Sequence, residues 1–268
     1  MKIAQIQMNT REPKEENLRA AEYFIEEAVR LDGPDLIILP EYYATLNADA
    51  ADQQATGEEF PEGQSFRLMA ALAEKHKVTI HAGSVVEKSG NRFHNTTVVF
   101  GPRGELLAKY RKIHLFDVVV PGGMVFRESD TVAPGEDVVT YRVGEFTVGC
   151  AICYDLRFPE LFRKLRDAGA DVIALPAAFT LQTGKDHWEV LARARAIETQ
   201  TYFLATGQIG TYAEGKKASW GHTMAIDPWG HIIAQASDRP GFITARLDKK
   251  LIEETRRGIP LAEHHVLA

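Results

Sequence analysis

The sequence has few cysteines, no long apolar run and no excess of positive charge. Only two of the 268 residues are cysteine, Cys150 and Cys153, whereas a secreted chain stapled by disulfides normally has more. No stretch approaches the roughly 20 consecutive apolar residues of a membrane-spanning helix. The opening residues Met1–Thr10 alternate like a strand and lack the apolar segment of a signal peptide. These features favour a cytoplasmic protein with no membrane partner.

The charge balance argues against nucleic acid as a partner. The 37 acidic and 31 basic residues give a formal net charge of −6, and a negative field repels phosphates and anionic lipid surfaces. Hydrophobic residues make up 45% of the chain and charged residues 25%, which is typical of globular proteins. A chain of this length fits two small domains or one large domain.

Two kinds of predicted strand are present. Asp35–Leu39 is a continuous apolar run, as in a strand covered on both faces, and Val78–Val86 has the same character. Other strands flank turn residues, as around Gly101–Gly104 and Gly144-Glu145, which indicates hairpins. The sequence therefore predicts an α/β protein with mixed sheets.

Helical periodicity separates these strands. Apolar residues recur at helical spacing in residues 13–31. Pro159 suits the first turn of a predicted helix over Pro159–Ala168. Asp186 and Glu189 resemble a capping box that begins a predicted helix over Asp186–Gln200. Helices alternating with strands favour a layered α/β fold. Two sheets packed face to face with helices outside explain both kinds of strand.

Two residues stand where an open sheet exposes its strand ends to ligands. Glu41 follows the strand ending at Leu39, and Cys153 follows a predicted strand over Phe146–Ile152. A third residue, Lys112, ends the basic run Lys109–Lys112, where Tyr110 and Lys112 share one face of a strand. We expect a nearby helix start and the Lys112 cation to lower the pKa of the Cys153 thiol, because a thiolate is the reactive form. Each residue alone also fits a structural role: a buried thiol, a solvated carboxylate or a solvated charge.

Three motifs together resemble the nitrilase superfamily of carbon–nitrogen hydrolases. The motifs are Leu39-Pro40-Glu41, Tyr110–Asp117 and Cys153–Leu161, in the order and separation of that family. Later segments resemble the branch of omega-amidases and deaminated glutathione amidases: His187–Leu191, Arg195–Gln200, Gly221-His222 and Asp227–Gly230. Nearly the whole chain takes part in the similarity.

The resemblance implies the fold and the active site. It implies a four-layer αββα sandwich, a single carbon–nitrogen hydrolase domain over residues 1–268, and homodimers that stack through the helices after Cys153 and near Asp186. It implies a Glu41-Lys112-Cys153 triad with neither cofactor nor metal. Glu128 matches a second glutamate of the family, expected to orient Lys112 or the substrate, although a surface loop carboxylate is the alternative.

The predicted reaction is hydrolysis of a small-molecule carboxamide to a carboxylic acid and ammonia through a cysteine thioester. Cys153 is the expected nucleophile, Glu41 the general base, and Lys112 with the backbone N–H of Tyr154 the oxyanion donors. Arg157 fits either a site for a substrate carboxylate or an ion pair with Glu160. Nitriles and N-carbamoyl compounds are alternative substrates for the same triad.

Three other classes of protein fit parts of the sequence. Cys150 and Cys153 form a C-x-x-C pair, which suggests a thiol–disulfide protein, but three residues along a strand place side chains on opposite faces. A cysteine protease or transferase would use a histidine base such as His114, His187 or His222. A scaffold that has lost activity is disfavoured by retention of all three triad residues.

Overall fold

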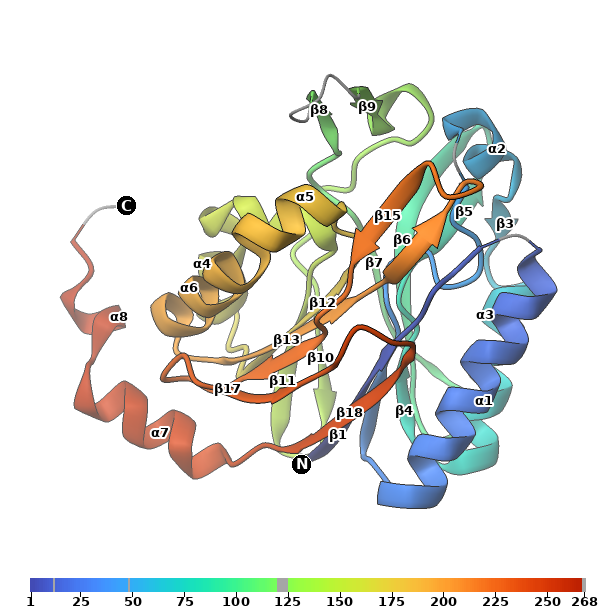
Figure 1. Cartoon of the computed structure of the whole chain (residues 1–268). Coiled ribbons are helices and arrows are strands. Elements are labelled where there is room, and N and C mark those ends of the chain that lie inside the picture. Colours follow the sequence, from blue (N-terminus) through green and yellow to red (C-terminus); the bar gives the residue numbers. More distant parts are fainter. Residues whose placement is uncertain (12, 48, 120–124, 267–268) are drawn as a thin grey trace.

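The computed structural model describes residues 1–11, 13–47, 49–119 and 125–266 as two β-sheets packed face to face, with helices on both outer sides (Figure 1). Helices α1 and α3 cover one sheet, and α4 and α6 cover the other. The predicted α/β sandwich of two mixed sheets flanked by helices is confirmed.

The first sheet pairs the two ends of the chain as neighbouring strands at one edge, β1 beside β18. In the described residues it contains eight strands in the order β18-β1-β2-β4-β6-β5-β3, with β7 also paired to β6. Its central strands run parallel, while β18 and β6 are antiparallel to their neighbours. The strands are β1 (Lys2–Gln7), β2 (Leu36–Ile38), β3 (Glu58–Glu59), β4 (Thr79–His81), β5 (Val85–Ser89), β6 (Arg92–Phe100), β7 (Leu106–Arg111) and β18 (Gly241–Arg246).

The second sheet has a parallel centre and antiparallel edges. Its order in the part of the chain described is β10-β11-β12-β13-β16-β17, with β11, β12 and β13 parallel. Parallel neighbours place their carboxyl ends at one edge of a sheet, where open sheets bind ligands. The strands are β10 (Thr140–Val143), β11 (Phe146–Cys150), β12 (Val172–Ala177), β13 (Tyr202–Gly207), β16 (Met224–Ile226) and β17 (Ile232–Gln235).

Apolar faces of the helices complete two cores. Helix α1 (Lys14–Asp32) and α3 (Gln64–His76) bury Leu18, Ile25 and Met69 against the first sheet. Helix α4 (Pro159–Asp167) and α6 (Glu189–Thr199) pack on the second sheet, in a core that continues between the two sheets. Gly33, with φ of +55°, ends α1 in the left-handed conformation that glycine adopts without steric cost.

Two predicted elements differ from the structure. The expected strand Val78–Val86 is interrupted after His81, because Gly83 has φ of +44° and lies so close to the Pro40 carbonyl that a Cβ would be 2.1 Å from it. The helix expected from Asp186 begins earlier, with a turn α5 (Leu181–Thr183) and a π-helical segment over Gly184–Trp188. The prediction that Asp186 begins a helix was wrong.

Two hairpins and three helices complete the described chain. The hairpins are β8 (Asp117–Val119) with β9 (Val125–Arg127), and β14 (Ile209–Tyr212) with β15 (Lys217–Trp220). The helices are α2 (Ala50–Ala55), α7 (Lys249–Gly258) and α8 (Leu261–His264). Figure 1 shows both hairpins and α2 at the same end of the sandwich. In the described ranges, no helix is both long and apolar enough to cross a membrane.

Candidate active site

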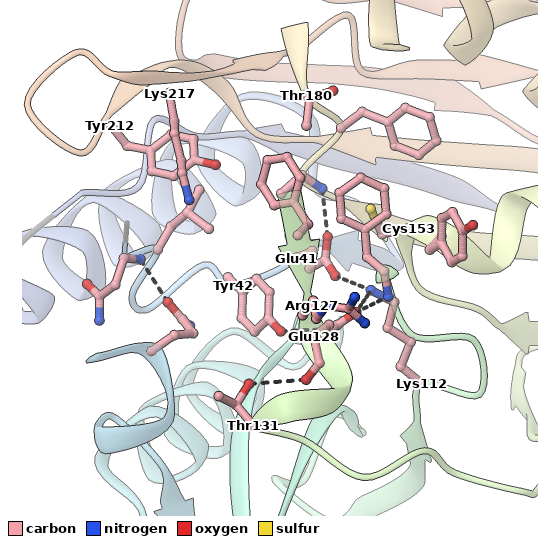
Figure 2. A pocket seen from close by; sticks show the side chains of 18 of the residues that line it. Glu41, Tyr42, Lys112, Arg127, Glu128, Thr131, Cys153, Thr180, Tyr212 and Lys217 are labelled. Atoms are coloured by element: carbon pink, nitrogen blue, oxygen red, sulfur yellow. Dashed lines mark hydrogen bonds and ion pairs between the residues drawn. The ribbon is translucent and has the colours of Figure 1, made fainter. Parts of the chain in front are cut away.

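One pocket brings together every site residue expected from the sequence. It has a volume of about 370 Å³, within the range of small-molecule sites. The six expected residues, Glu41, Lys112, Glu128, Cys153, Tyr154 and Arg157, all line it. Figure 2 shows Glu41, Lys112 and Glu128 directed toward one another with the Cys153 sulfur beside them. They arrive from separate loops at the ends of β2, β7, β9 and β11.

Glu41 has a buried carboxylate that accepts hydrogen bonds from a lysine side chain and a backbone N–H. Its side chain is 3% exposed. Oε1 accepts a hydrogen bond from Lys112 Nζ at 3.1 Å, and Oε2 accepts from the backbone N–H of Ala178 at 2.8 Å. Gln208 donates from Nε2 to the Glu41 backbone carbonyl at 3.0 Å. These contacts fix both the main chain and the carboxylate of Glu41.

Lys112 lies between two carboxylates. Its Nζ is 2.8 Å from Glu128 Oε2 and 3.1 Å from Glu41 Oε1, and its side chain is 2% exposed. Burial lowers the pKa of Lys112, but the negative charges of Glu128 and Glu41 outweigh burial and raise the pKa above its usual value. Lys112 is therefore an ammonium ion at neutral pH.

Glu128 begins a short 3₁₀ turn and is tied to several elements. Burial raises its pKa, but the Lys112 cation and hydrogen bonds outweigh burial, so the pKa of Glu128 is lowered. Its oxygens accept from the Phe116 N–H at 2.7 Å and from the Tyr42 hydroxyl at 3.0 Å. The alternative of a surface loop carboxylate is wrong for Glu128.

Cys153 sits in a strained turn directly after β11. Its φ of +46° lies in the left-handed region that residues with side chains rarely adopt, and it is 7% exposed. Burial and the Glu41 carboxylate raise the pKa of the thiol well above its usual value, and the Lys112 cation offsets only part of this. The expectation of a lowered thiol pKa was wrong, because burial of Cys153 and the adjacent Glu41 carboxylate outweigh the Lys112 cation.

Asp155 connects the cysteine turn to the lysine segment, although it was not among the site residues expected from the sequence. Its fully buried carboxylate accepts hydrogen bonds from the Tyr110 hydroxyl at 2.6 Å, from the Ile152 N–H at 2.8 Å and from the His114 N–H at 3.1 Å, and His114 Nδ1 is 2.7 Å away. Tyr110 and His114 flank Lys112 in the chain. Asp155 therefore fixes Cys153 relative to Lys112.

Arg157 is on the pocket wall between two aromatic rings. Its guanidinium lies 5.8 Å from the ring centre of Tyr154 and 5.6 Å from that of Phe179, and its NH2 is 3.3 Å from His187 Nδ1. Across the described residues no carboxylate is within ion-pair distance of Arg157, so the expected alternative of a pair with Glu160 is not formed.

The hairpin β14–β15 supplies further wall residues that the sequence did not single out. Tyr212 and Lys217 pair across the two strands and both line the pocket (Figure 2). Burial, then Glu41 and Cys153, raise the pKa of Tyr212 to about 12. Lys217 Nζ lies 5.0 Å from the ring centre of Phe126 in the other hairpin. Neither residue belongs to a motif, so only the fold reveals their position.

The structure does not support the residues expected for a histidine-dependent enzyme, a disulfide protein or a metal protein in those roles. Among the described residues no histidine lines the pocket: His222 contacts Asp238, while His114 and His187 contact Asp155 and Arg157. Cys150 and Cys153 are free thiols, and Cys150 is fully buried in the core between the sheets. No group of three possible metal-ligating side chains occurs in the part of the chain described.

Comparison with known proteins identifies the family. The carbon-nitrogen hydrolase family model matches residues 2–257. The chain is 41% identical to a deaminated glutathione amidase of Synechocystis sp. (98% of this chain, 97% of the relative) and 36% identical to the omega-amidase NIT2 of Homo sapiens (97% and 93%). The structure of Saccharomyces cerevisiae Nit3, a member of branch 10 of the nitrilase superfamily, matches with a TM-score of 0.89 at 32% identity, covering 97% of this chain and 94% of Nit3.

The chain therefore belongs to the carbon–nitrogen hydrolase family. It is a hydrolase of carbon–nitrogen bonds in linear amides, which yields an acid and ammonia. The family and the reaction expected from the sequence are confirmed. The role of each residue in the pocket stays a prediction.

Proposed function

We propose that Cys153 is the nucleophile, Glu41 the general base and Lys112 the oxyanion-stabilising cation of this amidase. The observation that supports the proposal is the meeting of a thiol, a carboxylate and an ammonium group in one buried pocket. Because the pKa of the thiol is raised, Cys153 is protonated at rest and needs a base at the moment of attack. The Glu41 carboxylate lies close enough to Cys153 to raise the pKa of the thiol, and we infer that it accepts that proton.

The first half-reaction forms a thioester. Glu41 takes the thiol proton as sulfur attacks the carbonyl carbon of the amide. The negative charge that develops on the carbonyl oxygen is stabilised by Lys112 and, we infer, by the backbone N–H of Tyr154. The protonated Glu41 then gives its proton to the amide nitrogen, the carbon–nitrogen bond breaks, and ammonia leaves.

The second half-reaction consumes water. Glu41, again a carboxylate, removes a proton from water as its oxygen attacks the thioester carbonyl. The carbon–sulfur bond breaks, the carboxylic acid is released, and the thiol regains its proton from Glu41. We assign Glu128 a supporting role, because its charge at 2.8 Å keeps Lys112 protonated in a buried site through both steps.

We propose that the substrates are small carboxamides with a remote carboxylate. Arg157 presents a guanidinium without a carboxylate partner in the described residues to the pocket, a geometry suited to a carboxylate ligand. The aromatic side chains of Tyr154 and Phe179 flank it and would cover the carbon chain of such a ligand. Similarity to proteins named omega-amidase and deaminated glutathione amidase supports the same class.

We propose that two copies associate through α6. Val190 and Ile197 lie on one face of this helix, 68% and 48% exposed, and Trp229 beside it is 53% exposed. Gly230 contacts the same face, since Arg193 Nε donates to its carbonyl at 2.8 Å. An apolar strip of this kind favours an interface. The family match over residues 2–257 supports a single domain, and the cytoplasmic location stays a prediction from the sequence.

The assignment is tested with two matched cysteine variants. Ammonia release from succinamate, a monoamide with a free carboxylate, should fall at least about 1000-fold in Cys153→Ala, because the nucleophile is lost. Cys150→Ala removes the buried neighbouring thiol and should retain activity. Loss of activity in Cys150→Ala with retention in Cys153→Ala would reverse the assignment. Arg157→Ala should raise KM for succinamate more than for butyramide, which lacks the carboxylate.

A further inference from the structure

Asn95 lies on β6 next to the candidate active site and hydrogen-bonds to Glu41, Glu128 and the main chain of Lys112. It is fully buried. Its side-chain Nδ2 donates to Glu41 Oε1 at 2.9 Å and to Glu128 Oε1 at 3.0 Å. Its backbone carbonyl accepts a hydrogen bond from the N–H of Lys112 at 2.9 Å. One residue therefore fixes two carboxylates and the main chain of the lysine between them.

We propose that Asn95 is a positioning residue that directs the proton of the nucleophile to one oxygen of the general base. The inference rests on the proposed roles of Glu41 and Cys153. It adds a residue outside the three motifs, together with a specific atom, Glu41 Oε2, as the proton acceptor.

The hydrogen bonds of Glu41 single out that atom. A carboxylate has about four acceptor sites, two on each oxygen. Oε1 accepts from Lys112 Nζ and from Asn95 Nδ2, which fills both of its sites. Oε2 accepts from the Ala178 N–H and has one site left. The proton of Cys153, and later that of water, is transferred to this remaining site.

An amide is the side chain that this position requires. Its NH₂ group has two donor hydrogens and no charge, so it can serve Glu41 and Glu128 at once. Aspartate in the same shape would place a third negative charge beside them. Serine has a single donor, and alanine has none. Without both donors, the carboxylate of Glu41 can turn and accept the proton on Oε1, away from the nucleophile.

The loss of a donor also changes when Glu128 becomes protonated. The hydrogen bond from Asn95 is one of the contacts that lower the pKa of Glu128, so its loss raises that pKa. The groups that face Glu128 are the Lys112 ammonium, the Tyr42 hydroxyl and, across Lys112, the Glu41 carboxylate, and none of them is replaced when Asn95 is shortened. A protonated Glu128 no longer supports the charge of Lys112, so the acid limb of kcat/KM should move toward higher pH in the variants.

The experiment compares Asn95→Ala and Asn95→Ser with Thr97→Val in the full-length protein. Thr97 is also fully buried, lies two residues along the same face of β6, and its hydroxyl contacts His81 Nε2 at 3.4 Å, outside the pocket. With succinamate as substrate, kcat of Asn95→Ala should fall about 10- to 100-fold, as for a lost hydrogen bond to a charged group. KM should change less than about 2-fold, and Asn95→Ser should be intermediate.

The position of the acid limb decides the outcome. A limb shifted to higher pH in both Asn95 variants, but not in Thr97→Val, supports the inference. A limb at the wild-type pH overturns it, whatever happens to kcat, because a purely structural role lowers only the amount of active protein. If Asn95→Ala does not fold, Asn95→Ser gives the decision alone. Retained activity in Glu41→Gln would instead overturn the proposed function, so the two failures are distinguishable.

Discussion

At the scale of single residues, the candidate site keeps its nucleophile neutral and its cation charged. Burial and Glu41 raise the pKa of Cys153, whereas the two glutamates raise the pKa of Lys112. The same carboxylate thus suppresses the thiolate at rest and is available to remove the proton during attack. This arrangement protects the thiol from non-specific reaction while leaving it ready for a substrate placed beside Lys112.

The first prediction concerns the acidity of Cys153 in Glu41→Gln. The Glu41 carboxylate raises the pKa of the thiol, so replacing it with a neutral amide removes that repulsion and the thiolate should form at lower pH. The rate of alkylation by iodoacetamide, followed against pH by mass spectrometry, should shift to lower pH while amidase activity is lost. An unchanged or higher alkylation pH would contradict the electrostatic account. Cys150→Ser serves as the background for single-thiol labelling.

The motifs identified the reacting groups but not the residues that orient them. Glu41, Lys112, Glu128 and Cys153 could be named because each belongs to a recognisable segment. Asn95 lies outside the motifs, and Asp155 lies inside the Cys153–Leu161 motif but was given no role. The importance of both comes from hydrogen bonds to residues distant in sequence. The thiol pKa was also mispredicted, since desolvation depends on what packs around a side chain and no local pattern records it.

At the scale of elements, a charged cluster ties three strands of the first sheet together. Glu87 on β5 is 2% exposed and accepts hydrogen bonds from Thr96 on β6 and from Lys109 and Arg111 on β7. Burial alone would raise the pKa of Glu87, but these donors outweigh it and lower the pKa to about 2. Strand β7 leads directly to Lys112, so the cluster also holds in place the segment that carries Lys112.

The second prediction concerns the pH dependence of stability in Glu87→Gln. Because the pKa of Glu87 is lower folded than unfolded, its contribution is complete above about pH 4.5 and is lost as the pH falls toward 2. A shift of this size corresponds to at most about 3 kcal/mol. Urea unfolding should show Glu87→Gln destabilised at pH 7, with the difference from wild type shrinking below pH 4.5.

A matched control lies on the neighbouring strand. Glu59 on β3 pairs with Lys88 but is 65% exposed, and exposed ion pairs contribute little. Glu59→Gln should therefore unfold like the wild type at every pH. A Glu87→Gln variant that is equally stable, or whose deficit persists at pH 2, would contradict the assigned role of the cluster.

Element boundaries show what periodicity could and could not predict. Most of the helices and strands that the sequence predicted agree with the structure within one or two residues, because buried helices and strands have distinct apolar spacing. The hairpins β8–β9 and β14–β15 were not predicted. The break at Gly83 was not predicted, because it depends on a close approach to Pro40, which is distant in the chain. The π-helical segment over Gly184–Trp188 was not predicted for a similar reason: Gly184 packs against Trp220, where a Cβ would lie 2.2 Å from the tryptophan side chain.

At the scale of the whole molecule, the pocket exists only because two sheets meet. Glu41 and Lys112 come from the first sheet, Cys153 from the second, and both hairpins lie at the same end of the sandwich (Figure 1). The sequence predicted the two layers from the mixture of hairpins and continuous apolar strands. It could not predict the pocket walls, since Tyr212 and Lys217 reach the site through tertiary packing alone.

The third prediction concerns self-association through the apolar strip of Val190, Ile197 and Trp229. We expect the wild type to sediment as a dimer. The double variant Val190→Glu/Ile197→Glu should be a monomer, because the interface would bury two unpaired carboxylates, which is costly. Analytical ultracentrifugation measures the mass. Leu31→Glu on α1, where Leu31 is 57% exposed, is the control and should stay dimeric. A monomeric wild type, or a dimer indifferent to the strip, would contradict this interface.

The central claim is that Cys153 forms the covalent intermediate of amide hydrolysis. The most direct measurement is acid quenching of the enzyme during turnover of succinamate, followed by peptide mass spectrometry. The account predicts a succinyl group on the peptide that contains Cys153, located on Cys153 by fragmentation and absent from Cys150, and accompanied by released ammonia. Turnover with no acyl group on Cys153, or with the acyl group on another residue, would contradict it.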